Sequence, residues 1–378
     1  MKKMWLAMGW LLLGGLAACA AARGAGAGAP VRAEVISLGT LDCFEAGLTD
    51  TDGKPVFCEG SAVVLVDDRL VIANDKYIPG EGNSNVFSVP LSEIRNPESL
   101  GAGRLPYGGN FFNQPSKIES LTATPGGELY FGATAFDRIQ SDSKAWDSYN
   151  MLFYWEKDTP DRPRLLFQTE DEGIVSSKSL RSAFEKVLRT RNYPNGVGYF
   201  KIEGLVALPD NSLLFGIREI GSDYTRAEQT FLLVRANYLK SSAGVIVDPV
   251  LELVYAYDPR ELSEINKPLG VAALEYHAPS EQILISTTYE QEGQPFESYF
   301  WSLSLEQLRK RLPPVLIRDK QGNPLTLPHK AEGLTFLNKK TAFVICDEDK
   351  NLSPVATGKG QQIRQPHQAV YAVLRFDW

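Results

Sequence analysis

The sequence predicts an all-β fold, and its composition and internal repeats carry that prediction. Glycine (32), tyrosine (15) and phenylalanine (18) are plentiful among the 378 residues, whereas methionine (4) is scarce, a balance typical of strands and tight turns. One pattern of strand, turn and strand occurs five times along the chain. Repeated supersecondary units indicate a fold in which the units stack on one another. A β-propeller, with four-stranded blades around an axis, satisfies both observations.

Four copies of the repeat begin at a glutamate and end at an acidic residue that closes the second strand. Turn residues such as Asp67-Asp68 separate the two strands, as expected for hairpins. The fifth copy, from Leu269 to Glu290, has leucine in place of the first glutamate. The four regular copies run from Glu59 to Asp75, from Glu119 to Asp137, from Glu203 to Glu219 and from Glu332 to Asp347.

Further β-rich runs complete the four-stranded blades, except at the end of the chain. After the last copy only the run 369–376 remains, so the final blade lacks one strand, which residues 32–38 can supply. We therefore expect one domain over residues 32–378, with five blades and a ring closed by pairing of the N- and C-terminal strands. A divergent sixth blade around residues 39–56 is the alternative.

One segment departs from the β pattern. Leu180, Phe184, Val187 and Leu188 stand at helical spacing among basic residues, which predicts a short basic amphipathic helix near residues 175–195. This insertion connects an outer strand to the next inner strand, so it should lie on the face that carries the repeat glutamates. It serves either as packing on the rim or as a functional lid.

The first 18 residues have the layout of an export signal. Two lysines precede an apolar run and small residues, and the run is too short to cross a bilayer comfortably. The stretch from Leu16 to Cys19 resembles the lipobox of bacterial lipoproteins. This resemblance implies a lipid on Cys19 and sorting to the outer membrane, facing the periplasm or the cell surface; an ordinary cleaved signal is the alternative. Residues 19–31, rich in alanine and glycine, are expected to form a flexible tether.

The net charge excludes one class of partner. The chain carries 39 basic and 46 acidic side chains, a formal charge of -7. Such a field repels nucleic acid and anionic lipid headgroups. We therefore expect no nucleic-acid partner, and contact with a membrane only through the lipid anchor.

Three further cysteines would lie in an oxidising compartment. Cys43 with Cys58 closes a loop of about 15 residues, which is worth roughly 3 kcal/mol in chain-entropy models, and this pair is the expected disulfide. Cys58 with Cys346 is the rival pairing, because each of these two residues directly precedes a motif carboxylate.

The repeat glutamates predict a metal site. The first strand of each propeller blade lines the axis, so the glutamates should meet at one level, where carboxylates raise one another's pKa unless a cation lies among them. Oxygen ligands without histidine or thiolate suit Ca2+ better than Zn2+. The expected metal ligands are Glu59, Glu119, Glu203 and Glu332, and Asp75, Asp137, Glu219 and Asp347 are expected to be outer groups or the catalytic base.

Lysines form a second expected ring. A lysine stands two residues before the repeat position in four of the five copies, and alternate residues of a strand share a face. Together with Arg218 these lysines would hold a phosphate ester; in the alternative interpretation they only pair with the glutamates of neighbouring blades. The four lysines are Lys117, Lys201, Lys267 and Lys330.

Other catalytic signals are absent from the sequence. It contains no G-x-S-x-G elbow, H-E-x-x-H motif, Walker loop or dinucleotide fingerprint. Of the three histidines only His329, three residues before Glu332, lies near the expected mouth of the channel, and we expect it to be a turn residue.

The repeated Glu-Gly-Leu strand with an acidic strand end resembles the secreted bacterial propellers of the phytase-type esterase-like family, over most of residues 32–378. The five blades with an axial ion are also similar to the calcium-activated apyrases. Both resemblances imply a divalent cation and a phosphate ester or anhydride as substrate. Carried over by position, the calcium ligands would again be Glu59, Glu119, Glu203 and Glu332, whereas Leu269 offers no oxygen.

These observations predict a lipid-anchored propeller that holds Ca2+ and hydrolyses a phosphorylated or other anionic ester. The alternative is a non-catalytic propeller that binds a protein or glycan partner in the cell envelope. The sequence alone does not decide whether the chain is an enzyme.

Overall fold

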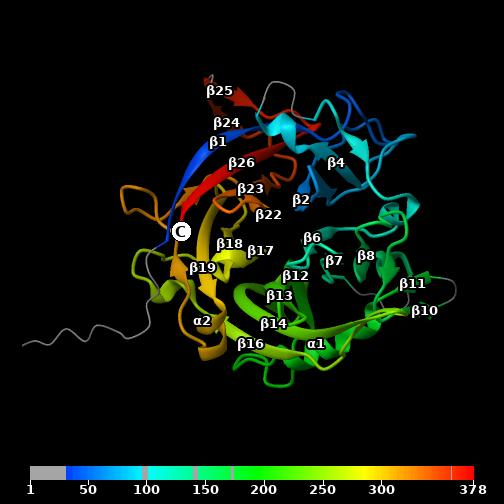
Figure 1. Ribbon diagram of the computed structural model, residues 1–378, viewed down its shortest axis with the longest axis vertical. Coiled ribbons are helices and arrows are strands. Elements are labelled where there is room, and N and C mark those ends of the chain that lie inside the picture. Colours follow the sequence, from blue (N-terminus) through cyan, green and yellow to red (C-terminus); the bar gives the residue numbers. More distant parts are fainter. Residues whose placement is uncertain (1–30, 96–100, 139–143, 172–173, 359) are drawn as a thin grey trace, which may run out of the picture.

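Five antiparallel sheets stand around a central axis and form a five-bladed β-propeller (Figure 1). The structure is a computed structural model that describes residues 31–95, 101–138, 144–171, 174–358 and 360–378. Residues 1–30, which include the expected signal segment and Cys19, lie outside these ranges. No helix within the described ranges has the length and apolar character needed to cross a membrane.

Blades 1 and 2 have their strands in chain order from the axis to the rim. A short hairpin, β10 (Thr169–Asp171) with β11 (Ile174–Ser176), follows blade 2. Blade 1 consists of β2 (Gly60–Val66), β3 (Arg69–Asn74), β4 (Val86–Pro90) and β5 (Leu105–Pro106). Blade 2 consists of β6 (Ile118–Ala123), β7 (Leu129–Thr134), β8 (Leu152–Glu156) and β9 (Arg164–Leu165).

Blades 3 and 4 each have a third strand that pairs with two short outer strands. In blade 3, β14 is long enough to pair with both β15 and β16, and in blade 4, β19 pairs with β20 and β21. Blade 3 consists of β12 (Tyr199–Leu208), β13 (Ser212–Gly221), β14 (Ala227–Ser241), β15 (Gly244–Val247) and β16 (Glu252–Tyr257). Blade 4 consists of β17 (Gly270–His277), β18 (Gln282–Tyr289), β19 (Glu297–Ser304), β20 (Val315–Leu316) and β21 (Thr326–Leu327).

Blade 5 closes the ring with strands from both ends of the chain. Its order is β22 (Ala331–Asn338), β23 (Thr341–Cys346), β26 (Gln368–Asp377) and β1 (Arg32–Asp42). Ten residue pairs join β1 to β26 in antiparallel register, from Arg32 with Asp377 to Asp42 with Gln368. The predicted closure and the five blades are confirmed. The segment between β1 and β2 forms no sixth sheet among the described residues. A hairpin, β24 (Pro354–Thr357) with β25 (Gly360–Ile363), is inserted before β26.

The hydrophobic core is divided into five wedges, one between each pair of neighbouring blades. Blades 2 and 3 enclose the wedge that contains Phe131, Phe184 and Phe215, for example, and blades 5 and 1 enclose Tyr371 and Ile72. Strands of all five blades are therefore buried on both faces, as a radial arrangement of sheets requires. The remaining wedges lie between blades 1 and 2, 3 and 4, and 4 and 5.

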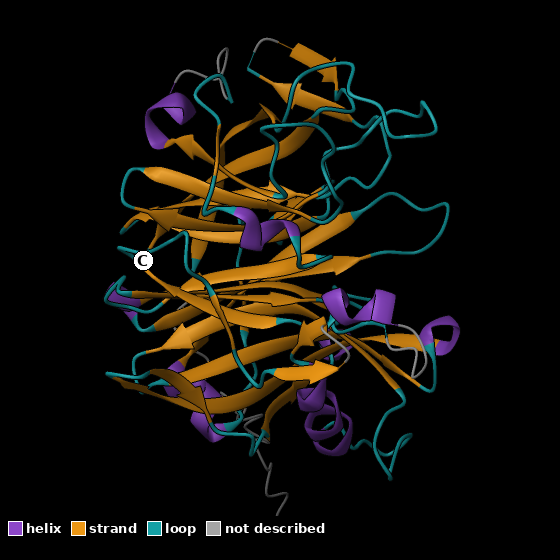
Figure 2. Ribbon diagram, turned by 90° about the vertical axis from the view of Figure 1, so that its right-hand side faces the viewer, coloured by secondary structure: helices purple, strands orange, loops and turns teal. Residues whose placement is uncertain are grey.

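The helices lie outside the sheets, towards the two faces of the ring (Figure 2). The predicted insertion folds as a 3-10 turn, η5 (Lys178–Leu180), that continues into α1 (Arg181–Val187), so the helix is shorter than the predicted span. A second helix, α2 (Leu305–Lys310), follows β19 and begins with a capping box between Ser304 and Gln307. The other 3-10 turns are η1 (Leu91–Arg95), η3 (Asn110–Asn113), η4 (Lys144–Tyr149), η6 (Tyr224–Arg226), η7 (Pro259–Glu261) and η8 (Ala278–Ser280).

The cysteines pair within the connection from β1 to β2. Cys43 is joined to Cys58, with a Cα–Cα distance of 6.1 Å. Cys346 is a free, buried thiol on β23. The bond therefore fastens the irregular segment that leads from the closing strand into the first blade.

Candidate functional site

Each blade carries a β-bulge near the start of its innermost strand. At the bulge one residue stands unpaired between two residues that do pair with the second strand. A bulge bends the strand and re-aims the side chain that it carries. The five unpaired residues are Ser61, Glu119, Glu203, Ala272 and Glu332.

This register corrects the alignment of the repeat in blade 1. The bulge falls on Ser61, so Glu59 stands two residues before it, where blades 2, 3 and 5 have lysine. The main chain agrees, because the amide of Asp75 donates to the carbonyl of Glu59 at 2.7 Å, as the amide of Asp347 donates to that of Lys330 at 2.9 Å. The prediction that Glu59 is equivalent to the other repeat glutamates is wrong.

Blade 4 is misaligned in the same way. Its bulge falls on Ala272, and Gly270 occupies the position that is lysine elsewhere. Lys267 is therefore out of register, and it pairs with Glu297 and lies 4.8 Å from the ring centroid of Tyr289. The prediction that Lys267 belongs to the lysine ring is wrong, and blade 4 contributes no charged side chain from these two positions.

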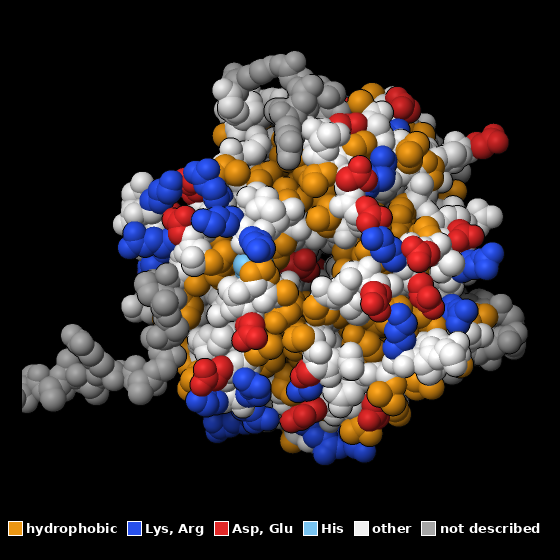
Figure 3. Space-filling view, in the orientation of Figure 1, with side chains coloured by type: hydrophobic (Ala, Val, Ile, Leu, Met, Phe, Trp, Pro, Cys, Tyr) orange, Lys and Arg blue, Asp and Glu red, His pale blue; other side chains and the backbone are white. Residues whose placement is uncertain are grey.

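Three of the four predicted metal ligands do meet. Glu119, Glu203 and Glu332 come from blades 2, 3 and 5, all three are buried, and each offers an oxygen within 4.8 Å of the others. They line a space of about 10 Å3, which is about enough for one water-sized particle. Acidic side chains are visible at the bottom of the central opening in Figure 3. We call Glu119, Glu203 and Glu332 the axial triad.

Basic side chains already neutralise the axial triad. Lys201 contacts Glu203 and lies 3.5 Å from Glu119, so it bridges blades 2 and 3. Lys330 lies 3.2 Å from Glu332 within blade 5. Lys117 lies 3.4 Å from Glu119. Every member of the triad therefore has an ammonium group within ion-pair distance.

Arg218 completes this network from a second bulge. It is unpaired on β13 towards both neighbouring strands, and its buried guanidinium lies 2.9 Å from Glu332 and 3.4 Å from Glu203 and also contacts Glu290. A Cβ atom at Gly270 would come within 2.7 Å of the Arg218 side chain. The glycine of blade 4 thus leaves the room that the arginine of blade 3 occupies.

The pKa values of the three triad glutamates depend on their burial and on how many basic side chains lie near each of them. Burial raises the pKa of Glu119 to about 8, and the neighbouring Glu203 adds to the effect. Burial also raises the pKa of Glu203, but Lys201 and Arg218 outweigh it and lower that pKa to about 2. The pKa of Glu332 is raised by burial and by Glu203. The triad therefore holds one firmly ionised carboxylate between two that favour their protonated forms.

A second carboxylate group consists of Glu59, Asp75 and Asp347, whose oxygens also lie within 4.8 Å of one another. Lys76 lies 3.1 Å from Glu59 and 2.5 Å from Asp75, but its side chain is half-exposed. One oxygen of Asp75 is buried without a hydrogen-bond partner in the described part of the chain. Burial and the nearby Asp347 raise the pKa of Glu59 to about 7. We call Glu59, Asp75 and Asp347 the outer triad.

The two groups differ in how well they fit Ca2+. An ion in the axial triad would lie among Arg218, Lys201 and Lys330, three buried cations that repel it. In the outer triad Lys76 is half-exposed and can turn to solvent, and the one buried ammonium at ion-pair distance among the described residues is that of Lys330, 3.6 Å from Asp347. Both Asp75 and Glu203 have carboxylate oxygens without a hydrogen-bond partner. Hard oxygen ligands of this kind suit Ca2+. Fewer buried cations surround the outer triad, so it is the better candidate for a Ca2+ site.

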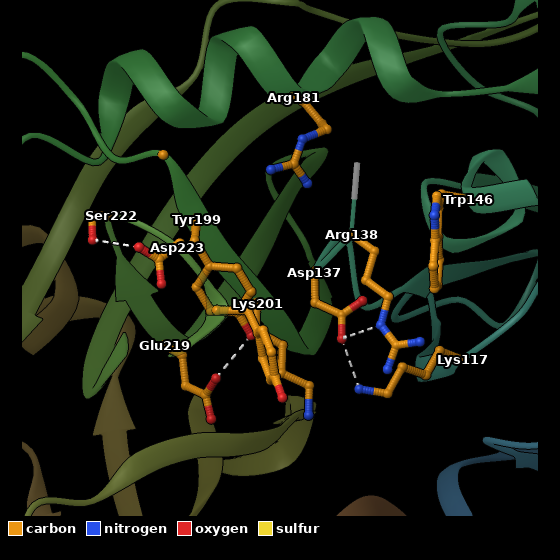
Figure 4. Close-up of a pocket in the computed structure, with 12 residues that line it drawn as sticks. Lys117, Asp137, Arg138, Trp146, Arg181, Tyr199, Lys201, Glu219, Ser222 and Asp223 are labelled. Atoms are coloured by element: carbon orange, nitrogen blue, oxygen red, sulfur yellow. Dashed lines mark hydrogen bonds and ion pairs between the residues drawn. The ribbon is translucent and has the colours of Figure 1, made fainter. Parts of the chain in front are cut away.

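A pocket of about 680 Å3 opens beside the channel, below α1 (Figure 4). Four of the predicted site residues line it: Lys117, Lys201, Asp137 and Glu219. We call it the α1 pocket. In all, its lining includes four basic and three acidic side chains. Arg181 projects from α1 towards the pocket, where it contacts the carbonyl oxygen of Phe136.

Hydrogen bonds and ion pairs hold the acidic groups of the α1 pocket in place. Asp137 accepts from Lys117 at 2.9 Å and lies 3.8 Å from Arg138. Burial opposes ionisation of Asp137, but Lys117 and Lys201 outweigh it and lower its pKa. The hydroxyl of Tyr199 donates to Glu219 at 3.0 Å. Glu219 remains partly exposed, at 24% of its side chain, so it can reach a bound ligand.

Sequence reasoning missed several residues of these sites. Arg138 packs on the rings of Trp146 and Tyr149, at 5.1 and 4.8 Å from their centroids, and it directly follows the predicted Asp137. Lys76 likewise directly follows Asp75. A basic residue after the acidic strand end was the signal that could have found both.

Comparisons with known proteins add no function. No protein-family model matches the chain, and no curated protein matches it. Similar solved structures include the PQQ-bound aldose sugar dehydrogenase of Streptomyces coelicolor, with 8% identity, coverage of 92% of this chain and 99% of that one, and a TM-score of 0.38. An α-L-arabinofuranosidase of Podospora anserina in complex with cellotriose gives 8% identity, 90% and 97% coverage and a TM-score of 0.38. The α-L-arabinanase of Penicillium chrysogenum with arabinobiose gives 11% identity, coverage of 86% of this chain and 84% of that one, and a TM-score of 0.40. At TM-scores this low the likenesses carry no argument, and the assignment of the fold rests on the strand topology.

Proposed function

We propose that the chain is a propeller hydrolase that binds a small phosphate-bearing or other anionic ester in the α1 pocket and cleaves it with the help of Ca2+. One observation carries the proposal: Lys117, Lys201 and Arg138 line the same cavity as the partly exposed Glu219. Cations that receive an anion and a carboxylate that receives a proton are the two parts such a reaction needs.

The lysines would bind the anion. The side chains of Lys117 and Lys201 are each only 12% exposed, so their charges act in a partly dehydrated wall, where ion pairs are stronger than in water. Arg138, stacked on two aromatic rings, adds a planar guanidinium that can hold two phosphate oxygens. Asp137 keeps Lys117 and Arg138 in position.

Glu219 would be the general base. Water would attack the phosphorus or carbonyl carbon, its proton would pass to Glu219, and the ester oxygen would leave with the bonding pair and take a proton from solvent. The Tyr199 hydroxyl orients the Glu219 carboxylate. Asp137 is the poorer candidate, because Lys117 donates to it at 2.9 Å, whereas the arginine that pairs with Glu219, Arg218, lies 3.8 Å from it.

Ca2+ would be held by Glu59, Asp75 and Asp347. When bound, it would supply positive charge next to the lysines of the α1 pocket. The Lys117 amide donates to the carbonyl oxygen of Asp75 at 3.1 Å, which places the outer triad next to the strand that carries Lys117. The phytase-type esterase-like family is consistent with this chemistry, and a lipid on Cys19 would fix the enzyme to the outer membrane. Mass analysis of the N-terminal peptide from membranes tests the anchor.

Phosphate release tests the reaction. Purified protein is incubated with phytate, a nucleoside diphosphate and an aryl phosphate, each with Ca2+ or with chelator. We expect Ca2+-dependent release from at least one substrate, and a loss of about 100-fold or more in Glu219→Gln, the range of general-base catalysis. Glu252→Gln, at an exposed position of β16 outside the pocket lining, should match the unmodified protein. No release from any substrate would overturn the hydrolase proposal.

The calcium assignment has its own test. Ca2+ should raise the thermal midpoint, because a ligand that binds only the folded state stabilises it. Asp75→Asn should abolish that rise, whereas Glu119→Gln should keep it. If Ca2+ instead raised the thermal midpoint of Asp75→Asn and not that of Glu119→Gln, the ion would bind in the axial triad.

A second candidate function is a non-catalytic binding propeller in the cell envelope. The observation that favours it is the saturation of the axial triad by Lys201, Lys330 and Arg218, which link four of the five blades as structural ion pairs. This function predicts no release in the phosphate assay together with retention of a protein or glycan partner from envelope extracts.

A further inference from the structure

Another pocket shares no lining residue with the α1 pocket. Its volume is about 1000 Å3, and it lies between the loop from β18 to β19 and the segment from β23 to the β24–β25 hairpin. Four carboxylates line it, Glu290, Glu292, Glu348 and Asp349, and its described lining includes no lysine or arginine. We call it the acidic pocket. Its charge is thus opposite in sign to that of the cations in the α1 pocket.

Two of the four charges have basic partners. Arg218 contacts Glu290, and Lys330 lies 3.2 Å from Asp349. Glu292 is exposed and has no basic partner among the described residues, and the imidazole of His329 is the one basic side chain that pairs with Glu348 among them. The pocket therefore retains a negative charge that its own surroundings leave uncompensated.

His329 gives the pocket a directed acceptor. It is 2% exposed, and its Nδ1 atom lies 3.0 Å from Glu348, which is itself buried. The hydroxyl of Ser353 donates to the other Glu348 oxygen at 2.5 Å, and the Lys330 amide also points to Glu348, at 3.4 Å. In the tautomer that carries its proton on Nδ1, that nitrogen donates to the Glu348 carboxylate and Nε2 is an acceptor. No described residue bonds to Nε2, and His329 lines the cavity.

Apolar side chains form the rest of the wall. Pro295, Phe296, Pro328 and Pro354 line the pocket together with the acids, so the cavity offers flat, apolar surface next to negative charge. A neutral apolar ligand would leave the charge of Glu292 without a partner, and an anion would be repelled. An ammonium group carries three donors for oxygen and nitrogen acceptors.

We propose that the acidic pocket binds an organic cation, an ammonium group carried on an aromatic or other apolar frame. The ammonium would donate to His329 Nε2 and lie near Glu292 and Asp349, while its frame would pack on Phe296 and the prolines. The site is independent of ester cleavage in the α1 pocket, because the two cavities share no lining residue.

Calorimetric titration of the full chain with three probes of one shape tests this proposal. Benzylamine carries a positive charge, benzyl alcohol none and benzoate a negative charge. We expect saturable binding of benzylamine, at least tenfold weaker binding of benzyl alcohol and no binding of benzoate. Equal affinity for the amine and the alcohol, or no saturation with the amine, would overturn the proposal.

Two variants locate the binding. Glu292→Gln removes an exposed, unpaired charge and His329→Gln removes the acceptor, and each should weaken benzylamine binding at least threefold. Glu252→Gln removes an exposed charge on the outer strand β16 and should leave the affinity unchanged. If both pocket variants bind as the unmodified protein does, the cation does not bind in the acidic pocket. Because Glu292 is exposed and makes no ion pair with a described residue, its variant stays informative even if His329→Gln fails to fold.

Discussion

Arg218 lies where blade 4 has glycine and alanine, Gly270 and Ala272, at the two positions that carry charged side chains in blades 2, 3 and 5. Its guanidinium contacts carboxylates of blades 3, 4 and 5, and it does so because a bulge on β13 turns it inward and Gly270 leaves space for it. A buried charge without partners is costly, so the carboxylates depend on this arginine as much as it depends on them.

Replacing Arg218 should therefore weaken the whole fold. Arg218→Met leaves Glu203 and Glu332 with less compensation, and removing one partner of a buried ion pair typically costs about 3–5 kcal/mol of unfolding free energy. Urea unfolding measures the change. Arg309→Met, at an exposed position of α2, should stay within about 0.5 kcal/mol of the unmodified protein. A loss no larger in Arg218→Met than in the control would contradict the role given to the arginine.

The raised pKa of Glu119 predicts how stability depends on pH. Between the ordinary value of 4.5 and about 8, Glu119 is protonated in the folded chain and ionised in the unfolded chain. The unfolded state then binds fewer protons, so the free energy of unfolding falls as pH rises through this window, by about 1.4 kcal/mol per pH unit for one such group. Below pH 4.5 this contribution is constant.

Urea unfolding between pH 5 and pH 8 checks this dependence. Glu119→Gln removes one titrating group, and the fall in stability across the window should become shallower. Glu252→Gln should keep the original slope. Parallel curves for all three proteins would show that Glu119 is not protonated in the folded state.

At the scale of single elements, the bulge explains both the success and the failure of the sequence interpretation. The five repeats are visible in the sequence because each strand pair needs the same alternation and turn residues. The position of the bulge cannot be recognised from the residue types, since it depends on which main-chain groups pair. Matching Glu59 and Leu269 to Glu203 by their neighbouring glycines therefore shifted two blades out of register.

Sequence patterns also fail to show which side chains contact partners on another strand or blade. Lys117, Lys201 and Lys330 were found because they stand at one place in the repeat. Arg218 was singled out only as a possible anion binder, because nothing in the sequence shows that it crosses into the gap of blade 4. His329 was interpreted as a turn residue, since its partner Glu348 follows 19 positions later on another strand end.

The short helix α1 forms the roof of the α1 pocket, and Phe184 attaches it to the blades. Phe184 is fully buried and its ring centroid lies 5.2 Å from Phe200 and 5.1 Å from Phe215. Phe184→Ala should lower the free energy of unfolding by about 3–5 kcal/mol, the usual cost of an aromatic deletion in a core. Lys186→Ala, on the exposed side of the same helix, should change it little.

Ligand binding separates the effects on stability and on the site. If α1 covers the pocket, Phe184→Ala at a temperature where it is fully folded should bind phosphate-bearing ligands more weakly than Lys186→Ala does. Equal binding by both variants would mean that the helix only packs on the rim.

For the whole molecule, ring closure through β1 decides whether the propeller is complete. β1 supplies the outer strand of blade 5 and pairs with β26 along ten positions. Without it, β26 would present an unpaired edge, and such edges promote association.

Truncation tests the closure. A chain that starts at residue 31 should keep the thermal midpoint of the full chain and elute as a single species in gel filtration. A chain that starts at residue 43 should unfold at a lower temperature and form aggregates. Equal midpoints for the two chains would show that blade 5 is stable with three strands.

The pairing of β1 with β26 also means that two neighbouring strands are synthesised at very different times. The ribosome makes β1 first and its partner almost a whole chain length later, a delay on the order of tens of seconds at about 5–20 residues per second. If blades form before synthesis ends, β1 has no partner until β26 has been made. An unpaired strand can pair with a strand of another copy of the chain. A nascent chain of this topology therefore has to be kept apart from its copies until synthesis ends.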